Sequence, residues 1–355
     1  MNKESLNKLL AMANDDEFNE LADRINDHMD TRNRITKDST PTTDRNDIRT
    51  KNFLADLSAD LQFQAEISKD GIGLILNGGG AKGCYQVGAV SAIREKNVLS
   101  FTGYSGTSIG ALNAAALSAS DVETAKAMWS NITNNDFLSV DDILHPDLEN
   151  DAALRNLLVS SGILDKIGPT SPITSVTAFD VESGYPADFV LNGMEEADKL
   201  KALMASAAFP IAFEQQEIEE VFYVDGGFPV FGDNMPVTPL YLLGFRKFIV
   251  IHTQSYAEAR HNALMAKLNA DVNKHAYYNG AMFVHLFPSR DMGDTLSGTM
   301  NFTPDYIAQG MELGYRDALA AHEFMEQLSV SAPDSFKECH VVNGKTFRSY
   351  EDLLA

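Results

Sequence analysis

The first part of the chain shows the spacing of amphipathic helices. Apolar residues stand three or four positions apart over residues 6–25 and again over residues 53–63, which predicts two helices. A polar stretch around Pro41 predicts a linker near 38–50. Two interpretations stay open for this helical extension: it packs on its own domain, or it docks on a partner or a membrane.

From residue 71 onward, short apolar runs alternate with glycine turns and helical segments. Strands are predicted at 72–77 and 101–105, and each is followed by a glycine-rich turn and a helix. This alternation predicts an α/β fold with a mostly parallel sheet and helices on its faces. Further strands are predicted at 174–179, 187–191 and 248–252, and Asn343-Gly344 predicts a hairpin over 339–347.

These patterns divide the chain into three regions. We expect a helical extension over 1–70, an α/β domain over 71–330, and a C-terminal hairpin and tail over 331–355. Glycine use changes at the first boundary, because no glycine occurs in residues 1–70 and all 24 glycines follow.

The chain is strongly acidic. Lys and Arg number 28 against 50 Asp and Glu, which gives a formal net charge of −22. Such a surface repels phosphate backbones, so no nucleic-acid partner is expected. It also repels anionic lipid headgroups, so contact with a bilayer has to come from apolar surface or from a recruiting partner.

Cysteine use and the lack of long apolar runs indicate the compartment. Cys84 and Cys339 cannot form a disulfide scaffold for 355 residues, which fits a reducing, cytosol-like environment. No apolar run approaches the ~18 residues of a spanning helix. The N-terminus lacks the basic and then apolar order of a signal peptide, so we expect a soluble protein without a transmembrane segment.

A serine stands between two glycines after the second predicted strand, in Gly106-Thr107-Ser108-Ile109-Gly110. A nucleophilic serine has to protrude from a tight turn, and Gly106 and Gly110 let the strand and helix approach without Cβ clashes. Ser108 is therefore predicted to be a nucleophile. Ser105 precedes the turn and is interpreted as a structural residue at the strand end.

A glycine-rich loop, Gly78-Gly79-Gly80-Ala81-Lys82-Gly83, joins the first predicted strand to its helix. Backbone N–H groups at such a helix start form an anion site. A dinucleotide site would need an acid at the end of the next strand, where Ser105 and Gly106 stand, and a Walker A loop would need Ser or Thr after the Gly-Lys pair. An oxyanion hole therefore fits best. Cys84, in the first helical turn, is interpreted as buried filler, with an activated thiol as the alternative.

A carboxylate stands at the end of another apolar strand, in Asp225-Gly226-Gly227. This position holds Asp225 at the sheet edge, and the glycines leave room for a second side chain to meet it. Asp-Gly is also a common turn, so the pattern alone does not assign a function.

Together, the G-G-G-x-K-G, G-x-S-x-G and D-G-G motifs closely resemble those of patatin-like phospholipases. The resemblance implies a three-layer α/β/α sandwich and a Ser-Asp dyad without histidine. It assigns Ser108 as nucleophile, Asp225 as base and residues 78–83 as the oxyanion loop, with Gly106, Gly110, Gly226 and Gly227 as supports of the elbow and the turn. Residues 205–210 and 310–318 also resemble family segments, and Lys82 stands where many members have arginine. The resemblance covers roughly residues 71–325.

The sequence thus predicts a phospholipase A-type lipid acyl hydrolase that cleaves fatty-acyl esters of glycerophospholipids at a membrane surface, with no cofactor and no metal. Two alternatives stay open. One is a serine esterase for soluble esters with a Ser-His-Asp triad using His252 or His285, and the other is a non-catalytic interaction module. A further hypothesis is a bacterial toxin or effector that is translocated into a eukaryotic cell and activated by a host protein. Residues 281–284 are expected to line an acyl groove, to form a lid or to pack in the core.

Overall fold

The computed structural model describes residues 49, 53, 57–96, 99–132, 149–209, 213–227, 232–256, 278, 280–330, 338–342 and 345–347. The helix predicted over 6–25 lies outside the described residues, as does most of the linker predicted near 38–50. The boundaries expected between the three regions stay predictions.

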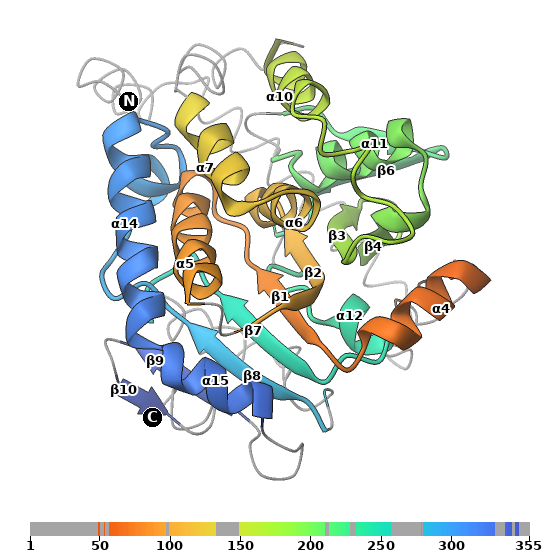
Figure 1. The fold of residues 1–355 in the computed structure, drawn as a ribbon. Helices are drawn as coiled ribbons and strands as arrows, with labels where there is room; N and C mark the ends of the chain where they lie inside the picture. Colours follow the sequence, from red (N-terminus) through yellow and green to blue (C-terminus); the bar gives the residue numbers. More distant parts are fainter. Residues whose placement is uncertain are drawn as a thin grey trace.

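A mixed sheet forms the centre of the described chain (Figure 1). Its strands are β1 Ile72–Leu76, β2 Phe101–Thr107, β3 Ile173–Asp180, β4 Pro186–Val190, β5 Gln216–Ile218, β6 Val221–Asp225, β7 Lys247–Ile251, β8 Met282–Leu286, β9 Glu338–Val342 and β10 Lys345–Phe347. Their order is β10-β9-β8-β7-β1-β2-β3-β6-β5, and β4 also pairs with β3. The pairs from β9 through β3 are parallel, and the outer pairs are antiparallel. The predicted mostly parallel sheet is confirmed, and β9 and β10 form the predicted antiparallel pair.

Helices cover both faces of this sheet. They are α4 Ala59–Ser68, α5 Cys84–Glu95, α6 Ile109–Ala119, α7 Val122–Asn131, α10 Glu149–Ser160, α11 Glu196–Ser206, α12 Thr238–Leu242, α14 Pro304–Ala320 and α15 His322–Val330, with single turns at Gly80–Gly83, Leu191–Gly193 and Thr295–Thr299. Figure 1 shows α5, α6, α7 and α14 gathered on one side of the strands.

Alternate residues of the central strands serve two separate cores, as the strand period of two requires. Leu74 and Leu76 of β1 pack in the core shared with α5, α6 and α14. Ile75 between them packs with Leu240 of α12 and Phe248 of β7 on the opposite face. The three-layer α/β/α architecture expected from the sequence is therefore confirmed.

The long helix α14 contains the predicted segment 310–318 and packs closely on α5. Added Cβ atoms on Gly88 and Gly314 would collide with the backbone carbonyls of Met311 and Tyr85. The glycines therefore permit the close approach of the two helices that flank the glycine-rich loop.

The helix expected over 53–63 is found in part as α4, which starts at Ala59; Phe53 is also helical, and residues 54–56 lie outside the described residues. Ser58 caps α4, and its hydroxyl accepts a hydrogen bond from the Leu61 amide at 3.3 Å. Leu61 is buried, whereas Phe63 is 68% exposed, because two positions along a helix point to opposite sides. Phe53 and Ala65 join Leu61 in the core of the same domain, which favours an extension that packs on its own domain.

The groove or lid expected for residues 281–284 is wrong, and the core alternative holds. Residues 282–284 belong to the buried strand β8, which pairs with β7 and β9.

Within the described ranges, no helix combines the length and apolar character needed to cross a bilayer.

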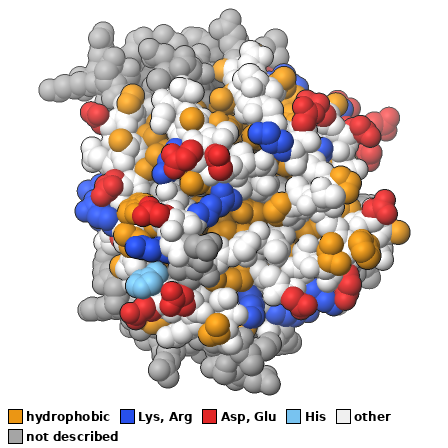
Figure 2. All heavy atoms as spheres, in the orientation of Figure 1, with side chains coloured by type: hydrophobic (Ala, Val, Ile, Leu, Met, Phe, Trp, Pro, Cys, Tyr) orange, Lys and Arg blue, Asp and Glu red, His pale blue; other side chains and the backbone are white. Residues whose placement is uncertain are grey.

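Charge is dispersed over the face of the molecule that Figure 2 draws. Acidic and basic side chains are scattered among exposed hydrophobic ones, and no large patch of one sign is seen there. This face therefore offers no concentrated charge for docking on an anionic bilayer.

Candidate active site

Ser108 lies between β2 and α6 in a strained backbone conformation. Its φ is 58° and its ψ is −130°, which is costly for a residue with a Cβ. A Cβ on Gly106 would collide with the Gly110 carbonyl, and one on Gly110 would collide with the Leu76 carbonyl. The turn that carries Ser108 therefore requires both glycines of the predicted motif.

Ser206 at the end of α11 holds the backbone of this turn. The Ser108 N–H donates to the Ser206 hydroxyl oxygen at 3.0 Å, and that hydroxyl donates to the Thr177 carbonyl at 2.7 Å. Ser206, which lies in the segment singled out in the sequence, thus supports the turn that carries Ser108.

The glycine-rich loop follows β1 and approaches Ser108. Gly79 and Gly80 have φ values of 151° and 55°, a region that favours glycine. The Gly78 N–H donates to the side-chain oxygen of Asn234 at 2.9 Å, and the Gly78 carbonyl accepts from the Thr253 hydroxyl. A Cβ on Gly78 would lie 3.0 Å from the Ser108 Cβ, so the loop lies directly beside the serine.

Asp225 ends β6, and the residue is 3% exposed. Its Oδ1 accepts the Gly227 N–H at 2.8 Å, and its backbone N–H donates to the Ala208 carbonyl at 2.9 Å. A Cβ on Gly226 would collide with the Thr177 carbonyl. The D-G-G turn is therefore required by packing against β3.

One cavity of about 410 Å³ brings the three motifs together. Ser108, Asp225, Gly227, Lys82 and Gly78 to Gly80 line it. Ala81 and Gly83 are buried and do not contribute to its wall. The rest of the wall is formed by Ile109, Leu112, Leu154, Ala207, Phe209, Phe213, Met300 and Phe302, with Asn234, Thr253, Gln254, Asp294 and Thr299 as polar members. Residues from distant parts of the sequence thus share one largely apolar site.

The histidines considered for a triad lie elsewhere. His252 Nε2 and His285 Nδ1 are 3.0 Å apart, and His252 Nδ1 lies 3.2 Å from the Asn77 side-chain nitrogen. Neither histidine is among the described residues that line the cavity.

The interpretation of Ser105 is confirmed, because its buried hydroxyl donates to the Pro236 carbonyl at 2.7 Å.

Cys84 is fully buried at the start of α5. Burial raises the pKa of its thiol to about 12, although hydrogen bonds to the backbone oppose the shift. The interpretation as buried filler is confirmed.

In the described part of the chain, no group of three or more His, Cys, Asp or Glu side chains is arranged to hold a metal ion.

Comparison with known families supplies the identity of the fold. Residues 74–241 match the family model described as "Patatin-like phospholipase". The chain contains a patatin-like phospholipase domain. The match begins within β1 and ends within α12, so it includes all three motifs.

Relatives of this patatin-like domain are found among mycobacterial proteins. Two curated proteins, from Mycobacterium bovis and Mycobacterium tuberculosis, are each named an uncharacterized NTE family protein. Each is 25% identical over 175 residues, which is 48% of this chain and 45% of the relative. The chain thus matches less than half of the length of these relatives. The crystal structure of VipD from Legionella pneumophila is similar with a TM-score of 0.42 and 16% identity, over 72% of this chain and 67% of that one.

Sequence reasoning missed two residues that shape the patatin-like site. Asn234 holds the glycine-rich loop, and Ser206 holds the Ser108 turn. Ser206 lies in a segment that the sequence did single out, so the resemblance could have suggested a role. Asn234 has no comparable local signal, because its partner Gly78 is 156 positions away.

Proposed function

We propose that the protein is a phospholipase A-type lipid acyl hydrolase that cleaves fatty-acyl esters of glycerophospholipids. One observation carries the proposal: Ser108, Asp225 and the loop of Gly79 and Gly80 line a single cavity whose remaining wall is largely apolar. A nucleophile, a carboxylate, backbone donors and an apolar pocket are the parts that acyl transfer from a lipid ester requires.

In the first half-reaction, Ser108 Oγ attacks the ester carbonyl and its proton passes to Asp225. A carboxylate is a weak base, so the position of Asp225 rather than its basicity has to make the proton transfer efficient. Backbone hydrogen bonds on both sides of Asp225 hold it there. The tetrahedral intermediate then collapses, and the lysophospholipid alcohol leaves with the proton from Asp225.

The oxyanion of the intermediate is assigned to the amides of Gly79 and Gly80. The Gly78 amide already donates to Asn234, and Ala81 and Gly83 are buried away from the cavity. The positive end of the helix that follows the loop adds to the stabilisation of negative charge. The sequence predicted an oxyanion loop of six residues, 78–83, and this proposal limits the hydrogen-bond donors to two of them.

In the second half-reaction, water attacks the acyl-Ser108 ester. Asp225 accepts a proton from the water, the same amides hold the oxyanion, and the fatty acid leaves as Ser108 recovers its proton. The two half-reactions together consume one water and one ester.

The apolar wall is assigned to the fatty-acyl chain. Ile109 and Leu112 lie on the first turn of α6, which directly follows Ser108, and Leu154 lies on α10. Phe302 is held by a stacked contact with Trp129, with ring centroids 6.2 Å apart. A cavity of this character favours a long acyl chain over a small polar ester.

The triad alternative has weaker support. Both ring nitrogens of His252 already have partners, in Asn77 and His285. A histidine base would have to contact Ser108 directly, and the histidine pair is not part of the cavity wall.

We further propose that a protein of eukaryotic cytosol recruits or activates the enzyme, as expected of an effector translocated into a host cell. The support is the net charge of −22, which gives no attraction to anionic bilayers. An acidic enzyme with a lipid substrate needs apolar contact or a recruiting partner.

The test measures fatty-acid release from phosphatidylcholine vesicles and hydrolysis of a short soluble ester, each with and without eukaryotic cytosol. We expect release from vesicles, stimulation by cytosol, and His285→Gln activity within a few-fold of wild type. Hydrolysis of the soluble ester alone would contradict the lipid substrate, and a robust rate unaffected by cytosol would contradict the activator. Loss of all activity in a folded His285→Gln variant would favour the triad.

A further inference from the structure

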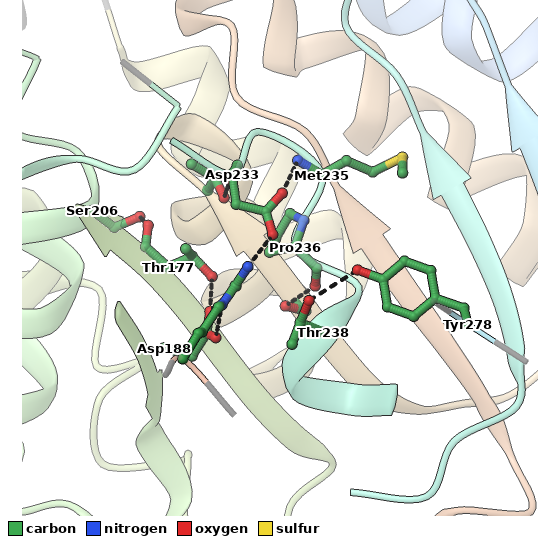
Figure 3. A network of polar contacts seen from close by, with 11 residues as sticks. Thr177, Asp188, Ser206, Asp233, Met235, Pro236, Thr238 and Tyr278 are labelled. Atoms are coloured by element: carbon green, nitrogen blue, oxygen red, sulfur yellow. Dashed lines mark hydrogen bonds and ion pairs between the residues drawn. The ribbon is translucent and has the colours of Figure 1, made fainter. Parts of the chain in front are cut away.

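Two buried carboxylates behind the active site share a single guanidinium group. The side chains of Asp188 and Asp233 are 0% exposed, and Arg49 is 5% exposed. Arg49 binds Asp188 through two hydrogen bonds, from Nε at 2.6 Å and from Nη2 at 2.5 Å. Its Nη1 donates to Asp233 at 2.5 Å. Figure 3 shows Asp188 and Asp233 within one polar network.

Arg49 comes from outside the patatin-like match, in the predicted N-terminal extension. It reaches 139 positions along the chain to Asp188 and 184 to Asp233. Burial by itself lowers the pKa of Arg49, but the two carboxylates outweigh it and the pKa is raised. The extension therefore contributes a fixed positive charge to a pair of buried negative charges, which would be costly to bury alone.

The first branch of the network leads from Asp233 to the glycine-rich loop. Asp233 accepts the Met235 N–H at 3.1 Å through Oδ1, and its backbone carbonyl accepts the Thr107 hydroxyl at 2.7 Å. These bonds fix the backbone on both sides of Asn234, the residue that accepts the Gly78 N–H. Thr107 is also the direct neighbour of Ser108.

The second branch leads from Asp188 through Thr177 to Ser206 (Figure 3) and from Ser206 to the Ser108 turn. Asp188 Oδ1 accepts the Thr177 hydroxyl at 2.5 Å. The Thr177 carbonyl accepts the Ser206 hydroxyl, and the Ser206 hydroxyl oxygen accepts the Ser108 N–H. Asp233 is thus connected to the glycine-rich loop and Asp188 to the Ser108 turn, which are two of the three motifs that form the site.

We propose that Arg49 is a positioning residue through which the N-terminal extension holds both active-site loops in place. Without it, Asp188 and Asp233 would repel each other in a buried site, and they would either move toward water or take up a proton. Either response disturbs the loops that carry Ser108 and Gly78. The effect on catalysis rests on the proposed function, whereas the effect on loop order does not.

The test uses the full-length chain and compares Arg49→Met with Arg94→Met as a matched control. Arg94 is also partly buried, but it donates hydrogen bonds to the Tyr104 hydroxyl and to the carbonyls of Leu117 and Ser120, and none of these three partners is a carboxylate. Hydrogen–deuterium exchange is measured on peptides covering 77–83 and 105–112. We expect exchange in both peptides to rise by about tenfold or more in Arg49→Met and to stay near the wild-type rate in Arg94→Met.

Kinetics separate positioning from general destabilisation. We expect kcat of Arg49→Met to fall about ten- to a hundredfold with KM nearly unchanged. The deficit should shrink as the pH falls from 8 to 6, because an unpaired buried carboxylate has a raised pKa and becomes neutral at lower pH. A loss of packing alone would give a deficit that does not change with pH.

Equal loosening in Arg49→Met and Arg94→Met, or wild-type exchange in Arg49→Met, would overturn the proposal. If Arg49→Met does not fold, Arg49→Lys is used instead, because lysine keeps the positive charge but lacks the guanidinium that contacts both carboxylates. We expect Arg49→Lys to raise exchange in the same two peptides to a smaller extent. If the wild type hydrolyses no lipid, the exchange result still decides the role of Arg49, and the proposed function fails separately.

Discussion

The side-chain oxygen of Asn234 accepts the backbone N–H of Gly78 at 2.9 Å, which ties the segment after β6 to the glycine-rich loop after β1. Asn234→Ala leaves this amide without its acceptor, so the loop beside Ser108 loses its anchor. We expect kcat for ester hydrolysis to fall about ten- to a hundredfold, because the oxyanion donors move out of place. Steady-state kinetics on a short soluble ester measure this effect without a vesicle surface.

Asn192→Ala is the matched control for this prediction. Asn192 is buried, whereas Asn234 is half-buried, and Asn192 binds the backbone of Thr174, Gly168 and Pro172, away from the cavity. Its loss should lower the melting temperature and leave kcat near wild type. A similar kcat deficit in both variants would show that Asn234 acts only through stability.

The hydroxyl of Ser206 supports the serine turn. Ser206→Ala leaves both the Ser108 N–H and the Thr177 carbonyl without this partner, which costs about 1–3 kcal/mol of unfolding free energy per buried group. We expect lower stability in urea unfolding and about tenfold lower kcat.

Ser175 on β3 provides the comparison for Ser206. It is also fully buried, and its hydroxyl has no hydrogen-bond partner among the described residues. Ser175→Ala should therefore be nearly neutral in both measurements. If Ser206→Ala were as mild as Ser175→Ala, the support of the Ser108 turn would be unnecessary.

The choice of acyl chain depends on the apolar wall of the cavity. Leu154 and Leu158 stand one turn apart on α10 and are both 1% exposed, but only Leu154 lines the cavity. A larger side chain in either place costs about 1–3 kcal/mol through overpacking. We expect Leu154→Phe, and not Leu158→Phe, to shift the preference toward shorter chains, measured as kcat/KM across p-nitrophenyl esters of increasing length. The same shift in both variants would place the acyl chain elsewhere.

The thiol of Cys84 is predicted to be inert in the folded protein. With a pKa of about 12, only about one thiol in ten thousand is ionised at pH 8, and the side chain is fully buried. Iodoacetamide at pH 8 should leave the Cys84 peptide unmodified in the native protein and modify it after unfolding in guanidinium. Rapid native modification, read by peptide mass spectrometry, would contradict the buried position.

Local patterns predicted those parts of the site that backbone geometry dictates. The turns at Gly78–Gly80, Gly106–Gly110 and Gly226 need glycine for steric reasons. These turns can therefore be predicted from the sequence alone. The alternation of short apolar runs with helices likewise predicted β1 and β2 close to their observed bounds, and a helix after each of them.

Long-range side-chain contacts left no comparable local signal. Ser206, Asn234 and Arg49 act on partners that are 98, 156 and 184 positions away in the sequence. The apolar run of β8 was ambiguous for a related reason, since its burial depends on pairing with β7 and β9. A short apolar run is equally compatible with a buried strand and with the wall of a groove.

The central claim is that Ser108 and Asp225 act as a dyad. The direct measurement is the rate of fatty-acid release from phosphatidylcholine vesicles by wild type, Ser108→Ala and Asp225→Asn, in the medium that gives the highest wild-type rate. We predict that each substitution lowers the rate by more than about a thousandfold while circular dichroism shows an unchanged fold. Near wild-type release by either folded variant would contradict the dyad.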